Sequence, residues 1–130
     1  SANMDAQLSY SASVTVDGEL REVAGNEAIE ITNIITGSQV IGTTYEVLAT
    51  TVIPQSGMVL YNTGDVDVSV RIRLSHFSIN EYLSFNLIAG GVMFFPRVYF
   101  NDEGRAAQME DIYARSASGT VTVDYCLLYA

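Results

Sequence analysis

Apolar and polar residues alternate with a period of two along most of this sequence, and that pattern constrains the fold more than any other feature. The cleanest example is residues 66–74. Its apolar set is Val66, Val68, Val70, Ile72 and Leu74, and its polar set is Asp67, Ser69, Arg71 and Arg73. A half-solvated strand of an antiparallel sheet has this pattern, whereas a surface helix repeats every 3.6 residues.

Further strand-like segments cover most of the chain: residues 8–16, 29–36, 41–53, 58–61, 82–89 and 121–129. Turn-forming residues separate them at intervals of about 8 to 15 residues, which suits a sandwich or jelly roll. One of these turns is Asp17-Gly18, a typical hairpin dipeptide. We therefore predict an all-β fold: a single antiparallel β-sandwich domain over residues 1–130, jelly-roll-like, with about eight strands.

The size and composition agree with a folded domain. The chain has 130 residues, of which 48% are hydrophobic and 16% charged. A chain of this length buries roughly two thirds of the surface that its unfolded form exposes. Disorder is therefore excluded, and a core can form without disulfides or metal.

Residues 105–115 are ambiguous. Ala106, Met109, Ile112 and Tyr113 would line one face of a helix, whereas only 111–115 alternates well as a strand. We expect a loop or short helix followed by a short strand.

Residues 92–100 are apolar on both faces. Val92, Phe94, Val98 and Phe100 share one face, and Met93, Phe95 and Tyr99 share the other. Pro96 indicates an edge strand or a bulge. Because exposed apolar edges associate unless they are covered, we predict that Phe95 and Tyr99 contribute to a contact between subunits. Phe95→Ser should then shift the oligomer toward monomer without unfolding it.

The charge balance excludes whole classes of partner. Fifteen acidic residues stand against six arginines and no lysine, for a formal charge of −9. Binding to nucleic-acid phosphates or to an anionic membrane requires clustered positive charge. No apolar run approaches the ~18 to 20 residues of a membrane-spanning helix. Residues 1–7 lack the order of a signal peptide. We expect neither a nucleic-acid nor a membrane partner.

The chain has one histidine and one cysteine, so a Ser-His or Cys-His pair would depend on these single residues. His76 follows the strand at 66–74, where we expect an ordinary polar residue at the start of a loop. Cys126 lies in an apolar strand-like run, where a thiol usually packs as a small hydrophobic group. A single cysteine forms no internal disulfide.

Metal and acid–base sites have no convincing motif. One histidine and one cysteine are too few for zinc. Residues 62–67 resemble the opening of a calcium loop, and 101–103 form a second oxygen-rich cluster, but neither has the twelve-residue spacing. Such residues also favour turns, which is the interpretation we prefer.

Adjacent acids and glycines also have simpler explanations. Glu110-Asp111 and Asp102-Glu103 are neighbours in polar segments, not acids facing each other across a cleft. Gly90-Gly91 lacks the lysine and helix of a phosphate-binding loop and indicates a tight turn. We predict no catalytic, cofactor-binding or metal-binding residue, and no cofactor.

Eight tyrosines and five phenylalanines leave one binding function open. Exposed tyrosines stack on sugar rings, but tyrosine is also a common half-buried strand residue. We favour the core or an interface over a sugar platform.

Three stretches carry a resemblance: 59–64 with the strand to 73, 87–91 leading to 94–96, and 112–120 leading to 123–125. Together they resemble small β-sandwich structural proteins of tailed bacteriophages, the kind found as capsid decoration, collar or tail-associated subunits. The resemblance covers residues 59–130. It implies a non-enzymatic, multicopy virion protein, assembled in the host cytoplasm, that binds other copies of itself and other virion proteins. A lectin-like carbohydrate-binding module is the alternative.

Overall fold

The computed structural model describes residues 4–48, 57–74, 78, 80–96, 100–102, 105–107 and 109–129. Within these ranges every regular element is a strand, so the all-β prediction is confirmed. The strands are β1 (Met4–Val16), β2 (Glu19–Ile31), β3 (Asn33–Ile41), β4 (Glu46–Val47), β5 (Gly57–Asn62), β6 (Val68–Leu74), β7 (Leu83–Leu87), β8 (Val92–Pro96), β9 (Phe100–Asp102), β10 (Arg105–Ala107), β11 (Met109–Ser116) and β12 (Val121–Tyr129).

Two four-stranded antiparallel sheets form the sandwich, in the orders β3-β12-β5-β8 and β4-β11-β6-β7. The pairs nest within one another: β3 with β12, β4 with β11, β5 with β8, and β6 with β7. Because successive pairs alternate between the two sheets, the ribbon is rolled up as in a jelly roll. Within the described ranges the sandwich contains eight strands, the hairpin β1–β2 adds two, and the short hairpin β9–β10 adds two more, so the prediction of about eight strands for the whole domain is too low.

The core lies between the two sheets. In β6 the predicted alternation is confirmed: Val68, Val70, Ile72 and Leu74 are buried, and the residues between them are partly exposed. The facing sheet contributes Ile41, Met58, Leu60, Val121, Val123, Leu127 and Tyr129 to the same cluster. Inward-facing residues of both sheets therefore fill one continuous apolar layer.

The described part of residues 105–115 is strand, in β10 and β11, so the expected loop or short helix before a short strand is wrong. β11 begins at Met109 and pairs with β6 and β4 on its two sides. The register shifts between Met109 and Asp111, as at a β-bulge. This bulge breaks the alternation before Asp111, which explains why only 111–115 looks like a strand in the sequence.

Two expected strands are divided. Residues 29–36 break at Thr32, where the chain passes from β2 into β3. Residues 41–53 are not one strand: β3 ends at Ile41, β4 covers two residues, and 49–56 lie outside the described residues. Alternation continues across both breaks, so periodicity alone does not reveal them.

The strand predicted within 92–100 is β8, at the edge of its sheet beside β5. This is the position that Pro96 indicates. The Phe95 side chain and the whole of Tyr99 lie outside the described residues. Their role in a subunit contact therefore stays a prediction.

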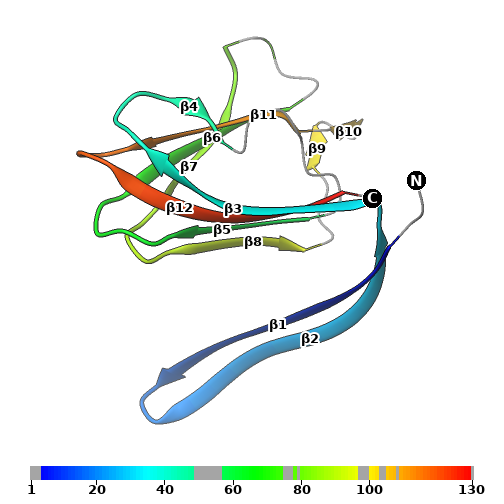
Figure 1. Ribbon diagram of the computed structural model, residues 1–130. Coiled ribbons are helices and arrows are strands. Elements are labelled where there is room, and N and C mark those ends of the chain that lie inside the picture. The colour runs from blue at the N-terminus through cyan, green and yellow to red at the C-terminus, as the bar shows by residue number, and fades with distance from the viewer. Residues whose placement is uncertain are drawn as a thin grey trace.

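The hairpin β1–β2, which we call the arm, extends from the sandwich (Figure 1). Its strands pair over thirteen positions, from Met4 opposite Ile31 to Val16 opposite Glu19. Asp17 and Gly18 form the predicted turn, with φ values of 51° and 79°. Two consecutive positive φ values match the right-handed twist of a hairpin, and glycine adopts them without strain.

Candidate functional site

The arm has one mainly apolar face, which also carries Glu19, Arg21 and Glu27. The register places the even-numbered residues of β1 beside the odd-numbered residues of β2, as in the pair Ala12 and Val23. The apolar members are Met4, Ala6, Leu8, Tyr10, Ala12, Val14, Val16, Val23, Ile29 and Ile31. At the base of the arm, Ile31 is buried and Leu8 and Ile29 are half-buried. This face is therefore partly covered at the base of the arm and extends beyond the covered part toward the tip.

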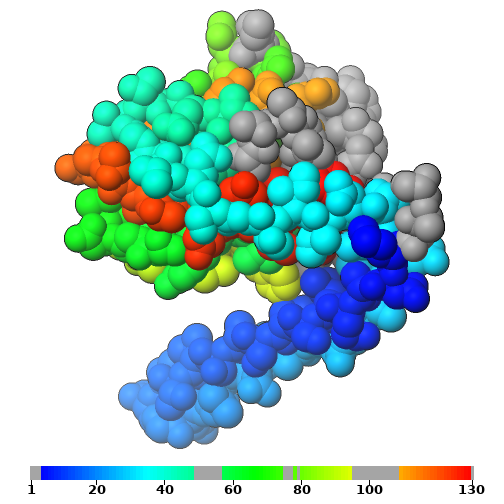
Figure 2. All heavy atoms as spheres, viewed as in Figure 1, coloured from blue at the N-terminus to red at the C-terminus, as the bar shows by residue number. Residues whose placement is uncertain are grey.

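Three valines on the distal half of this face, Val14, Val16 and Val23, are solvent-exposed by 61%, 56% and 69%. We call them the distal valines. Figure 2 shows the distal part of the arm separate from the sandwich in this view. An isolated two-stranded hairpin is marginally stable in water, so an exposed apolar face on one is unusual unless something covers it.

Tyr10 attaches the arm to the sandwich. Its ring packs edge-to-face against Phe94 of β8, with 5.6 Å between the centroids. It also lies across Gly25, its partner on β2, where an added Cβ would overlap the ring. Aromatic residues commonly cover a cross-strand glycine in this way. The arm is therefore held at mid-length on the β8 side of the sandwich.

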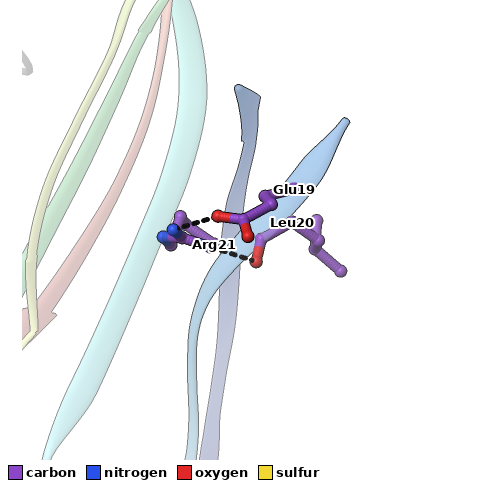
Figure 3. Close-up of polar contacts among 3 residues, drawn as sticks. All are labelled: Glu19, Leu20 and Arg21. Carbon is purple, nitrogen blue, oxygen red and sulfur yellow. Dashed lines mark hydrogen bonds and ion pairs between the residues drawn. The ribbon is translucent and has the colours of Figure 1, made fainter. Parts of the chain in front are cut away.

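The arm is acidic, with Asp5, Asp17, Glu19, Glu22, Glu27 and Glu30 against the single Arg21. Near the tip, Arg21 forms an ion pair with Glu19 and donates to the carbonyl of Leu20 at 3.5 Å (Figure 3). Both charged side chains of this pair are mostly exposed. Ion pairs of this kind contribute little to stability.

The outer face of the sheet β4-β11-β6-β7 carries a cluster of opposite character, which we call the arginine face. It consists of Tyr45, Arg71, Arg73, Tyr82, Asp111, Tyr113 and Arg115. Strand alternation explains the cluster. Arg71 is paired with Tyr113 and Arg73 with Asp111, while Val70, Ile72, Ile112 and Ala114 point into the core.

Arg71 lies at the centre of the arginine face. Its guanidinium carbon is 3.9 Å from the ring centroid of Tyr45 and 4.1 Å from that of Tyr82. Tyr113 is third at 5.4 Å, and Arg115 lies over the Tyr45 ring at 4.5 Å. Tyr45 precedes β4 and Tyr82 precedes β7, so Arg71 holds two loops against the sheet. Cation–π contacts of this kind are worth about 0.5 to 2 kcal/mol each.

Arg73 is fixed by Asp111. Its Nε and one terminal nitrogen both donate to the same carboxylate oxygen, at 2.9 Å and 2.6 Å. This hydrogen bond raises the pKa of Arg73. Three arginines against one aspartate give the arginine face a positive charge in a chain whose formal charge is −9.

Two tyrosines of the arginine face pack against the same arginine. Tyr45 and Tyr82 each have the Arg71 guanidinium over the ring. The guanidinium of Arg71 therefore covers one face of each of these two rings.

The residues considered for calcium form turn contacts. Asn62 is fully buried, and its amide donates to the carbonyls of Val66 and Leu87. The Asp67 carboxylate accepts the backbone N–H of Ala89 at 3.2 Å. In the part of the chain that the structure describes, no three potential metal ligands gather. Gly90 has a φ of 75° and belongs to the predicted tight turn.

The remaining candidates do not come together. Cys126 lies in β12 between Thr36 of β3 and Val59 of β5, and burial raises the pKa of its thiol. His76 and Glu103 lie outside the described residues, and Asn101 and Asp102 form part of β9.

Sequence reasoning missed the arginine face. The pattern of β6 placed Arg71 and Arg73 on an outward face, but nothing indicated which aromatic residues would lie beside them. The alternation of Asp111, Tyr113 and Arg115 was the available signal, and the competing helical interpretation obscured it. Tyr45 and Tyr82 lie just outside strands, where periodicity says nothing.

Comparisons with protein-family models, with curated proteins and with solved structures found no match to this chain. No helix within the described ranges is long and apolar enough to cross a membrane.

Proposed function

We propose that this protein is a non-enzymatic structural subunit that acts through protein–protein contacts, with the arm as its assembly element. The observation that carries the proposal is the exposure of the distal valines on a projecting two-stranded arm. Fully burying one such side chain contributes roughly 1.5 to 3 kcal/mol. Both long edges of the arm also carry backbone groups that can pair with another chain.

We further propose that the assembly is a virion, with this chain as a multicopy subunit of the capsid, collar or tail that binds itself and other virion proteins. Two features support this. The sequence resembles small β-sandwich structural proteins of tailed bacteriophages, and jelly rolls are frequent in viral capsid domains. Because one fold serves many functions, the argument from the fold is an analogy. The corresponding location is the virion, after assembly in the host cytoplasm.

The test of self-assembly is the molar mass in solution over a concentration series, by light scattering. We expect the wild-type chain to associate. Val14→Ser combined with Val23→Ser should weaken association at least about tenfold, since ~1.4 kcal/mol corresponds to a factor of ten. The matched control is Ser13→Ala, on the polar face of the arm. A wild-type chain that stays monomeric at high concentration would refute self-assembly.

A carbohydrate-binding module is the alternative, because lectin domains share this fold and Tyr61 is 41% exposed on the other sheet. A glycan array read with and without calcium tests it. Specific binding that Tyr61→Ala abolishes would favour this alternative.

A further inference from the structure

We propose that the arm of one copy docks on the arginine face of a second copy, so that subunits join head to tail. This inference rests on the proposed assembly function and names the two surfaces that meet. Its basis is the complementarity between an acidic, partly apolar arm and a positive, tyrosine-rich sheet face in the same chain.

The arginine face is built as a binding surface. Tyrosines pack around Arg71, and Asp111 holds Arg73, so these side chains lose little freedom when a partner arrives. Within the described part of the chain, neither Arg71 nor Arg115 forms an ion pair with a carboxylate. A partner that brings carboxylates would therefore neutralise charge that the subunit leaves unbalanced.

The distal half of the arm supplies the complementary groups. Asp17 at the turn is exposed there, and so is Glu19, which lies opposite Val16 on the same face as the distal valines. Tyrosine rings combine apolar carbon with a polar end, and Tyr and Arg are the residues enriched in interface cores. The valines can pack on the tyrosine carbons while the acids meet the guanidinium groups.

The arm and the arginine face of the same subunit lie on opposite sides of the sandwich, so the arm does not cover that face. Its anchor is the contact of Tyr10 with Phe94 of β8, which belongs to the sheet β3-β12-β5-β8. The arginine face is on the outside of the other sheet. Each copy therefore offers an arm on one side and a receptor surface on the other. Such a contact joins two different surfaces and produces a ring or an open chain.

Complementation between two charge-reversed variants tests the proposal. The arm variant is Asp17→Asn with Glu19→Lys, and the face variant is Arg115→Glu with Ser69→Asp, which leaves Arg71 and Arg73 in place. We expect each variant alone to associate at least about tenfold more weakly than wild type. An equimolar mixture should assemble again, because the reversed arm fits the reversed face and the native arm fits the native face.

The controls separate this inference from the proposed function. Asp65→Lys changes an exposed acid in the turn between β5 and β6 that belongs to neither surface, and it should leave association unchanged. Circular dichroism and melting curves establish that each variant is folded. A wild-type chain that does not associate would overturn the proposed function itself. A wild-type chain that associates while the face variant does so equally well, or variants that fail to complement, would overturn only the docking of arm on face.

Discussion

The side-chain amide of Asn62 donates a hydrogen bond to the carbonyl oxygen of Leu87 over 3.0 Å. Asn62 ends β5 in one sheet and Leu87 ends β7 in the other. The same amide donates to Val66 at 2.8 Å, and its oxygen accepts the N–H of Gly64 at 3.0 Å. One buried side chain therefore fixes two connections between the sheets: the crossover from β5 to β6 and the start of the crossover from β7 to β8.

Replacing this amide should be costly. Asn62→Ala removes both donors and leaves the buried Leu87 carbonyl without its side-chain partner, so we expect the free energy of unfolding to fall by about 2 to 4 kcal/mol. Urea unfolding measures the change. The control is Asn86→Ala, which loses one exposed hydrogen bond to Ser69 and should cost less than about 1 kcal/mol. Equal losses in the two variants would contradict the joining role of Asn62.

The inward and outward residues of β6 should respond differently to a carboxylate. Val70 is 1% exposed, so Val70→Asp buries a charge without a partner and should cost several kcal/mol, a large part of a typical total of ~5 to 15. Ser69→Asp, on the outer face, should cost less than about 0.5 kcal/mol. Thermal melts that find both substitutions equally mild would contradict the packing of β6.

The sequence predicted the parts of the fold that local alternation governs. In β6 burial follows the predicted alternation residue by residue, whereas in β12 it does so only from Val121 to Asp124 and the last three residues are all buried. At Thr32 the pattern continues although the chain leaves the arm for the sandwich. In β11 a bulge and pairing on both sides override a local helical periodicity. Such long-range pairings are invisible to a window of a few residues.

The two candidate surfaces also differ in how far local sequence predicts them. The sequence predicted the first strand of the arm and the Asp17-Gly18 turn, but not the strand at residues 19–28, where apolar residues do not alternate regularly. What the sequence left undecided was whether its apolar face would be covered. The arginine face joins residues from β6, β11 and two loops, so it exists only once the sheet order is known.

Arg71 should contribute to stability through the tyrosines that it contacts. Arg71→Met keeps a long apolar side chain but loses the charge over Tyr45 and Tyr82, and we expect a loss of about 1 to 2 kcal/mol in the free energy of unfolding. Arg71→Lys should recover part of this, since an ammonium keeps the charge but not the planar stacking.

The control for Arg71 is Arg21→Met near the tip of the arm, where the ion pair with Glu19 is exposed and the cost should be under about 0.5 kcal/mol. Urea unfolding compares the three variants. If Arg71→Met costs no more than Arg21→Met, the guanidinium does not hold the two loops on the sheet.

The stability of the folded chain should fall in alkaline solution because of two groups in β12. Burial raises the pKa of the Cys126 thiol and of the Tyr129 hydroxyl above their ordinary values of 9.0 and 10.0, and the neighbouring Tyr125 raises that of Tyr129 further. Below pH 9.0 both groups are mainly protonated in the folded and the unfolded chain, so their raised pKa values do not change the free energy of unfolding. As the pH rises past these ordinary values, the unfolded chain releases protons that the folded chain still holds, and the unfolded state gains stability.

Urea unfolding at a series of pH values from about 8 upward measures this loss. We expect the free energy of unfolding to decline with pH in the wild-type chain and to decline less steeply when Cys126→Ala is combined with Tyr129→Phe. Tyr61→Phe, at an exposed position on β5, is the matched control and should leave the slope as in wild type. A double variant that loses stability as steeply as wild type would mean that other groups cause the alkaline loss, and that burial in β12 does not hold these two protons.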